Sequence, residues 1–257
     1  MHAQQSLPYS TVLVASILVR AKITYYLFWL LGRVPLAWLQ RLGSTLGRLW
    51  MARKLREAKV AAINLELCFP ELAVGARECL LAETLAGTGQ TASELAWLWT
   101  RGAKRVLGAL QVVEGEPLFL GAIAARRGLI IAAPHLGAWE ALNLYLSRNT
   151  PIAILYRAPR IAWVEELINR CRGRFGAEPV RADAAGVRTL MRRLKDGGVV
   201  GILPDQQPKV GEGEFAPFFG HAALTMSLLP KLSTRTGAPV LFGWAPRLAN
   251  GAGYAIR

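Results

Sequence analysis

From Gly115 onward, short apolar runs alternate with amphipathic stretches, and this alternation limits the possible folds more than any other feature. A short apolar run bounded by glycine or proline is typical of a buried strand, whereas an amphipathic stretch is typical of a helix. The candidate strands are 128–134, 151–157, 197–205 and 238–246, and the candidate helices are 138–148, 161–173, 185–195 and 222–236. We therefore predict an α/β fold with a mostly parallel central sheet flanked by helices.

Two further helices are expected before this region, over residues 53–67 and 76–112. Pro70 interrupts the helical pattern between them, so "NLELCFPEL" is expected to form the turn. The last residues, "GAGYAIR", are typical of the beginning of a strand, and we expect that the domain continues beyond them. Residues 53–257 are thus predicted to form one domain, cut short at its C-terminal end.

The first 52 residues form a separate, basic and aromatic segment. Two apolar stretches, "TVLVASILV" and "ITYYLFWLL", are separated by "RAK", and no acidic residue occurs before Glu57. A spanning helix needs about 20 mostly apolar residues, and cations near its centre are costly. We therefore expect residues 1–52 to anchor the protein to a membrane through tilted or interfacial helices, with a true span as the alternative.

The charge balance indicates an anionic partner. Lys and Arg number 31 against 17 Asp and Glu, which gives a formal net charge of +14 in a chain that is 53% hydrophobic. Nucleic acid, anionic lipid and an acidic carrier protein would all be attracted by such a surface. Because the cations are interleaved with the apolar anchor and no RNA- or DNA-binding motif occurs, we expect no nucleic-acid partner.

The parallel sheet directs attention to the carboxyl ends of its strands, where ligands bind in such folds. His135, Arg157 and Asp205 each follow a candidate strand, and Glu140 lies in the first turn of the next candidate helix. If His135 lies in the loop, Glu140 can reach one ring nitrogen, which would make the other nitrogen a better general base. No Ser or Cys lies in a recognisable nucleophile elbow, which favours direct attack by a substrate hydroxyl.

Metal chemistry has little support in the sequence. Three cysteines lack any CxxC spacing, and three histidines are scattered along the chain. We predict neither a metal site nor an organic cofactor.

"HLGAWE" resembles the H-x4-E motif of the bacterial lipid A late acyltransferases, which belong to the wider lysophospholipid acyltransferase group. The similarity extends in order and spacing from about residue 60 to residue 246. It includes "NLELCFPEL", "ILYRAPR", "INRCRGRFGAE", "GGVVGILPDQQP" and the aromatic "EFAPFFGH" stretch.

The resemblance implies a glycerolipid acyltransferase-like fold and transfer of a fatty acyl chain from acyl carrier protein to a hydroxyl of a lipid A precursor. It implies work at the cytoplasmic face of the bacterial inner membrane, against an anionic lipid surface. His135 would be the base and Glu140 its partner, while Arg157, Arg172 and Asp205 would serve substrate binding. A guanidinium fork suits a phosphate, and Arg174 could add charge. Asp205 would then pair with one of these arginines.

Two other functions stay open from the sequence. One is an acyltransferase for another polar lipid, such as a phosphatidylinositol mannoside or a lysophospholipid. The other is a catalytically silent membrane-binding protein that keeps the fold. The "EFAPFFGH" stretch likewise suits either a mobile lid and acyl groove or ordinary core packing.

Overall fold

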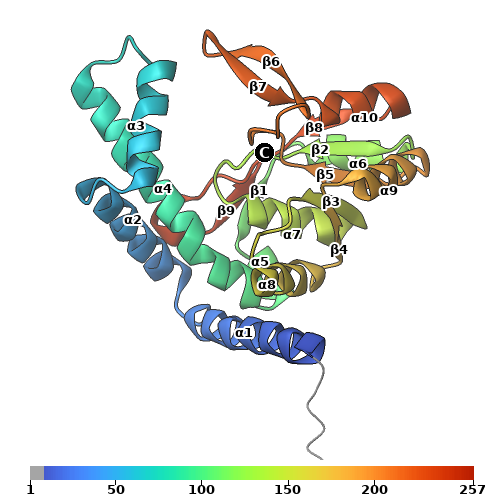
Figure 1. Cartoon of the computed structure of the whole chain (residues 1–257), viewed down its shortest axis with the longest axis horizontal. Helices are drawn as coiled ribbons and strands as arrows, with labels where there is room; N and C mark the ends of the chain where they lie inside the picture. Colours follow the sequence, from blue (N-terminus) through green and yellow to red (C-terminus); the bar gives the residue numbers. More distant parts are fainter. Residues whose placement is uncertain (1–8) are drawn as a thin grey trace, which may run out of the picture.

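The computed structural model describes residues 9–257, which form an α/β body with a helical arm beside it (Figure 1). The helices are α1 (Tyr9–Leu31), α2 (Leu36–Ala52), α3 (Arg56–Cys68), α4 (Val74–Thr100), α5 (Ala103–Leu107), α6 (Glu116–Ala124), α7 (Trp139–Asn149), α8 (Ala162–Gly173), α9 (Ala184–Lys195), α10 (Leu228–Thr236) and the 3-10 helix η1 (Ala249–Gly251). The strands are β1 (Leu110–Val113), β2 (Leu129–Ala132), β3 (Ile152–Tyr156), β4 (Ala177–Arg181), β5 (Val199–Ile202), β6 (Gly213–Phe218), β7 (His221–Met226), β8 (Val240–Phe242) and β9 (Tyr254–Ile256).

The central sheet has five strands in the order β4-β3-β5-β2-β8, and every neighbouring pair is parallel. This confirms the predicted parallel sheet, since each of the four candidate strands contains one of its strands, whereas the edge strand β4 was not predicted. β2 and β5 are buried along their whole length because helices cover both faces. The pairing of β2 with β5 brings the residues that follow these two strands to the same edge of the sheet.

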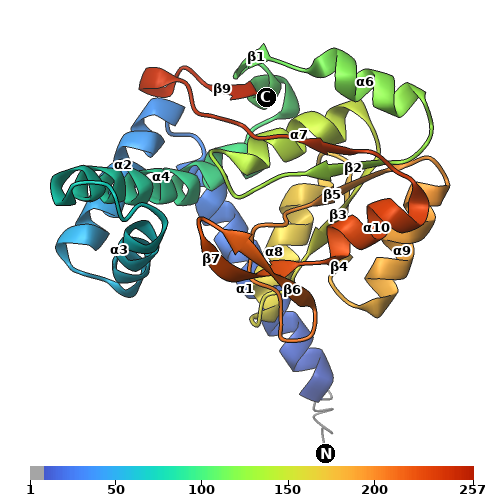
Figure 2. The same cartoon turned by 90° about the horizontal axis from the view of Figure 1, so that it is seen from above.

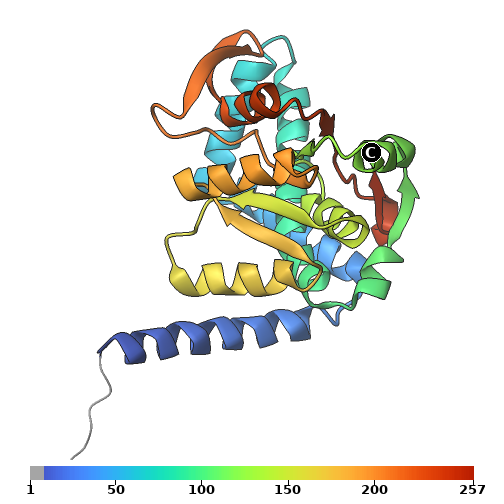
Figure 3. The ribbon, with the colours of Figure 1, turned by 90° about the vertical axis from the view of Figure 1, so that its right-hand side faces the viewer.

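Successive side chains of β2 enter two different cores. Leu129 and Ile131 pack with α7 and α8 on one face, whereas Ile130 packs with α9 and α10 on the other. Figure 3 shows this layering, with α8 and α9 on opposite sides of the sheet. The alternation follows from the strand period of two, and it explains why these runs are apolar throughout.

Helices α2, α3 and α4 form the arm, which lies to one side of the sheet (Figure 2). α2 crosses α4 closely because glycines face each other, and a Cβ on Gly43 would come within 2.4 Å of the Gly89 carbonyl oxygen. α1 runs beneath α8, where Arg170 lies over the Tyr25 ring.

Residues 1–8 of the predicted anchor lie outside the described residues. Within 9–257, no helix combines the length and the hydropathy that crossing a bilayer requires.

Two predicted helices are wrong in part. The helix expected over 76–112 ends at Thr100, and its last residues form α5 and then β1, which pairs in parallel with β9 near the end of the chain. The helix expected over 222–236 begins only at Leu228, because His221–Met226 pairs as β7 with β6 in an antiparallel hairpin. Both strands depend on pairing partners that a local apolar pattern does not reveal.

Candidate active site

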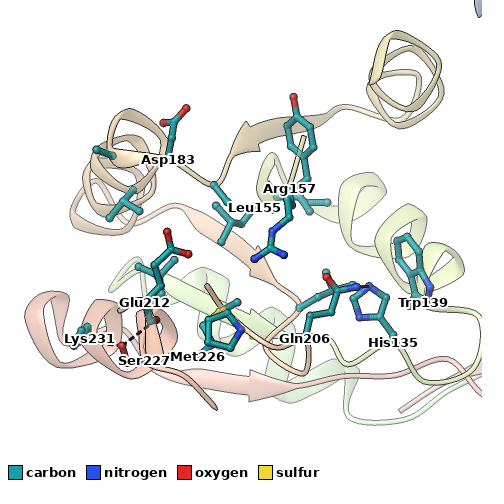
Figure 4. A pocket seen from close by; sticks show the side chains of 18 of the residues that line it. His135, Trp139, Leu155, Arg157, Asp183, Gln206, Glu212, Met226, Ser227 and Lys231 are labelled. Carbon is teal, nitrogen blue, oxygen red and sulfur yellow. Dashed lines mark hydrogen bonds between the residues drawn. The ribbon is translucent and has the colours of Figure 1, made fainter. Parts of the chain in front are cut away.

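His135 lies in the loop between β2 and α7, at the carboxyl edge of the sheet. Its side chain faces a cavity of about 500 Å³. Figure 4 shows His135 and Gln206 at one end of this cavity, Arg157 pointing into its middle, and Lys231 and Glu212 at the other end. The predicted strand-end residues His135 and Arg157 therefore open on one space.

Asp205 holds His135 by two contacts. Its Oδ1 lies 2.9 Å from the ring Nδ1 of His135, and its Oδ2 accepts a hydrogen bond of 2.7 Å from the His135 backbone N–H. An ionised carboxylate only accepts, so Nδ1 is the donor in this contact, and the neutral form of the ring has its lone pair on Nε2. The side-chain amide of Gln206 lies 3.2 Å from that Nε2 and is the donor to it.

These contacts also set the charge of Asp205. Burial works to raise the pKa of the Asp205 carboxyl, but hydrogen bonds from the side chain and the backbone of His135 outweigh it. The pKa of Asp205 therefore lies below its ordinary value. The Asp205 carboxylate is therefore charged at neutral pH.

The predicted contact between Glu140 and His135 is wrong in this structure. Glu140 is the second residue of α7 and points into the interface with α8, where its side chain is 1% exposed. Its Oε1 accepts hydrogen bonds of 2.8 Å from Nε and 2.5 Å from Nη2 of Arg172, and its Oε2 accepts one of 3.1 Å from Asn143. A carboxylate buried this deeply needs a cation, and Arg172 on α8 supplies it.

Asp205 likewise has a different partner from the one expected. It binds His135 rather than an arginine, because β5 lies next to β2 and delivers Asp205 to the loop that holds His135. The two carboxylates of the sequence prediction have thus exchanged partners.

Trp139 connects the two pairs. Its ring meets the His135 ring edge-on at a centroid distance of 5.3 Å, and the Arg172 guanidinium carbon lies 5.1 Å from the Trp139 ring centroid. Such contacts hold an aromatic ring in place from both sides. The buried Glu140–Arg172 pair therefore supports the wall against which His135 rests.

The other predicted cations divide into two groups. Arg157 and Arg172 both line the cavity, and Arg157 forms no ion pair with any residue that the structure describes. Arg174 instead donates a hydrogen bond to the backbone carbonyl of Trp99. The guanidinium of Arg157 can therefore bind a ligand in the cavity.

Several site residues were missed from the sequence. Gln206 was not predicted, because nothing in "PDQQP" indicates that its amide reaches His135. Lys231 lines the far end of the cavity and donates to Ser227 Oγ at 2.9 Å. Its position depends on where α10 begins, which the helical pattern placed too early.

Most of the remaining cavity wall is apolar, although Asp183, Glu212 and Ser227 also line it. The apolar part is formed on the sheet and its flanking elements by Ile154, Leu155, Ile168, Leu203, Met226 and Leu228. Phe215, Phe218 and Phe219 lie outside this wall, exposed on the β6–β7 hairpin, so ordinary core packing does not explain them.

Among residues 9–257, no three His, Cys, Asp or Glu residues are grouped so that they could hold a metal ion. The site combines an imidazole, a guanidinium without an ion-pair partner among residues 9–257, and a mostly apolar wall, which suits an amphipathic substrate.

Known proteins with similar sequences identify the family of this chain. Residues 14–257 match the family model described as bacterial lipid A biosynthesis acyltransferase. The lipid A biosynthesis lauroyltransferase of Escherichia coli K12 is 26% identical over 234 residues, covering 89% of this chain and 74% of the relative. The lipid A biosynthesis palmitoleoyltransferase of the same organism is 28% identical over the same coverage.

The lipid A biosynthesis myristoyltransferase of Escherichia coli K12 is 27% identical over 195 residues, which cover 76% of this chain and 58% of the relative. The family match extends over nearly the whole chain, including β2, β5 and the loops that carry His135 and Asp205. The chain is an acyltransferase of lipid A biosynthesis and belongs to the bacterial lipid A biosynthesis acyltransferase family.

Proposed function

We propose that the protein transfers a fatty acyl chain from the thioester of acyl carrier protein to a hydroxyl of a lipid A precursor, with His135 as general base. One observation carries this proposal. Asp205 Oδ1 lies 2.9 Å from Nδ1 of His135, at a cavity that has a mostly apolar wall and the guanidinium of Arg157. The apolar wall can hold an acyl chain and the guanidinium can bind a phosphate. Together with a base, they suit acylation of a phosphorylated glycolipid.

The reaction proceeds by direct transfer. Nε2 of His135 takes the proton of the acceptor hydroxyl while its oxygen attacks the thioester carbonyl, and the resulting imidazolium is stabilised by Asp205. The tetrahedral intermediate then breaks its carbon–sulfur bond. The imidazolium returns its proton to the departing thiolate, so the products are the ester and the carrier thiol, with His135 neutral again.

Gln206 occupies the position that the acceptor hydroxyl has to take. Its amide donates to Nε2 of His135. The incoming hydroxyl replaces this contact when it donates its own proton to Nε2. The exchange is favoured because a hydroxyl within reach of the base restores the hydrogen bond that it displaces.

Arg157 is the residue proposed to hold a phosphate of the acceptor. Its guanidinium points into the cavity and can offer two parallel donors to phosphate oxygens (Figure 4). Arg172 also lines the cavity, but its Nε and Nη2 already bind Glu140. Arg172 therefore contributes to substrate binding indirectly, by holding Trp139 in place.

The protein is proposed to work at the cytoplasmic face of the inner membrane. Large apolar side chains are exposed along α1 and α2, among them Leu27, Leu30 and Trp38. Cations accompany the aromatics, with the Arg33 guanidinium 4.0 Å from the Trp29 ring centroid. Aromatic and basic side chains in this mixture are typical of a membrane–water interface with anionic lipid.

An acceptor assay with product identification tests the proposal. The protein is incubated with acyl carrier protein thioesters and lipid A precursors, and mass spectrometry is expected to find one added acyl chain per acceptor. The His135→Ala variant is expected to bind the membrane normally and to form no product. Acylation of another polar lipid, with none of any lipid A precursor, would support the alternative acceptor instead. Full activity of His135→Ala would contradict the general-base mechanism.

A further inference from the structure

A second buried carboxylate lies outside the mechanism described so far. Glu94 is on α4, in the arm, and it is completely buried. Its partner Arg247 lies between β8 and η1, 153 residues further along the chain. Burying such a pair is costly unless its geometry is good and its remaining polar atoms are satisfied.

The geometry around Glu94 meets this requirement. Arg247 Nη2 donates to Oε1 at 2.6 Å, and Arg247 Nε lies 3.0 Å from Oε2. Oε2 also accepts hydrogen bonds of 3.2 Å each from Gln40 on α2 and from the Tyr254 hydroxyl on β9. The carboxylate thus joins two helices of the arm to the C-terminal part of the body.

Arg247 reaches beyond this pair to the loop that carries His135. Its Nη2 also lies 3.2 Å from the backbone carbonyl oxygen of Gly137, and 2.6 Å from Thr91 Oγ1, which itself lies 3.4 Å from that oxygen. Gly137 is two residues after His135. The guanidinium is therefore one hydrogen bond from the backbone that positions the base.

The loop has little freedom to move at this point. Gly137 has a φ of +66°, and a Cβ there would meet the Ala245 carbonyl oxygen at 2.3 Å. That same oxygen accepts a 2.8 Å hydrogen bond from the Ala138 N–H. Asp205 holds the His135 backbone from the other side. The loop is therefore held by Asp205 on one side and by Ala245 and Arg247 on the other.

We propose that Arg247, held by Glu94, is a positioning residue for acyl transfer, which fixes the His135 loop through the Gly137 carbonyl and ties it to α2 and α4. This inference rests on the proposed function, because it assumes that His135 is the base. Arg247 does not touch the substrate. A displacement of about 1 Å at a reacting group lowers the rate by about 100-fold. Loss of Arg247 is therefore expected to lower kcat and to leave KM for both substrates nearly unchanged.

The test must separate positioning from stability, because Arg247→Met alone leaves a buried charge without its partner. The double variant Glu94→Gln/Arg247→Met removes both charges, while the carbonyl of the introduced glutamine can still accept from Gln40 and Tyr254. It is expected to recover most of the melting temperature that Arg247→Met loses. Its kcat is nevertheless expected to stay about 10- to 100-fold low, with KM within about threefold.

Two further variants complete the set. Arg247→Lys keeps a charge opposite Glu94, but a single ammonium cannot also reach Gly137 as the fork does, so kcat should again fall. Tyr254→Phe is the matched control, because it removes one hydrogen bond from the same carboxylate and leaves the Gly137 contact intact. Its kcat should equal that of the wild type.

Hydrogen exchange of the peptide over residues 133–140 gives a readout that does not need activity. We expect faster exchange in the double variant and in Arg247→Lys, but not in Tyr254→Phe. Wild-type kcat in a double variant that has regained stability, or unchanged exchange of this peptide, would overturn the proposal. A wild-type protein that acylates no lipid A precursor would instead contradict the proposed function, and the exchange result would still decide the role of Arg247.

Discussion

Two acid–base pairs flank Trp139, and they differ in their access to solvent. In the pair that faces the cavity, the side chains of His135 and Asp205 are 32% and 38% exposed. In the pair between α7 and α8, those of Arg172 and Glu140 are 12% and 1% exposed. An open pair can exchange protons with a substrate, whereas a closed pair keeps its charges and supports the structure around it. We therefore infer that Asp205 takes part in the chemistry and that Glu140 supports the structure around it.

Asp205→Asn tests the open pair and should have the largest effect. The asparagine fits the same space but does not favour a proton on His135 Nδ1 or stabilise the imidazolium. We expect kcat to fall by about 1000-fold or more, with a change in melting temperature of only a few degrees. Steady-state kinetics and thermal unfolding of the same preparation measure both. A loss of activity below tenfold would remove Asp205 from the mechanism.

Glu140→Gln tests the closed pair, where we expect a loss of stability. Arg172 would keep its charge in a nearly closed site without a carboxylate, and breaking a buried pair costs about 3–5 kcal/mol in free energy of unfolding. Urea unfolding measures this loss. The control is Glu114→Gln, which breaks the pair with Arg257, in which the side chains are 54% and 50% exposed, and should cost about 1 kcal/mol or less. Equal losses in the two variants would argue against a supporting role for Glu140.

Arg157→Met sharpens the comparison on the substrate side. Arg157 has no carboxylate partner among residues 9–257, so its removal should change binding and leave stability unaffected. A charge-assisted hydrogen bond contributes about 1.5–3 kcal/mol, so kcat/KM for a phosphorylated acceptor should fall by about 10- to 100-fold. KM for the acyl carrier protein thioester should not change. Equal effects on both substrates would place Arg157 elsewhere in the reaction.

The sequence predicted well what is local. Four of the five strands of the central sheet are apolar runs that are visible in a few residues, and His135 and Arg157 follow from the ends of those runs. The edge strand β4, with the sequence AEPVR, has no such pattern and was not predicted. The partners of Glu140 and Asp205 could not be predicted from the sequence. They depend on which strands are neighbours and on the direction in which the first turn of α7 points. Asp205 is 70 residues from His135, and only the pairing of β2 with β5 brings them together. β1 was missed for the same reason, since its partner β9 lies near the end of the chain.

Gln206→Leu examines the other nitrogen of the His135 ring and should have a smaller effect. Without the amide, the acceptor hydroxyl meets Nε2 without first displacing a hydrogen bond. A net hydrogen bond contributes about 0.5–1.5 kcal/mol, so KM for the acceptor should fall by about two- to tenfold. A tenfold loss of kcat would show instead that Gln206 acts in the transition state.

The smallest expected effect is on the way that the stability of the protein depends on pH. The pKa of Asp205 is lowered in the folded protein, so its carboxylate stabilises the fold above the ordinary pKa of an aspartate, about 4. This contribution is lost as the pH falls through the lowered pKa. Melting temperatures of wild type and Asp205→Asn should therefore differ at neutral pH and converge in strong acid. A difference that grows toward low pH would have the wrong sign.

The most direct test of the central claim measures which nitrogen of His135 carries the proton. Nitrogen NMR of the ¹⁵N-histidine-labelled protein at alkaline pH distinguishes the protonated ring nitrogen from the one with a lone pair. Asp205 as the partner predicts the proton on Nδ1 in the wild type, and loss of this preference in Asp205→Asn. A proton on Nε2, or a Nδ1 preference that survives in Asp205→Asn, would contradict the assignment of Asp205 as the group that orients the base.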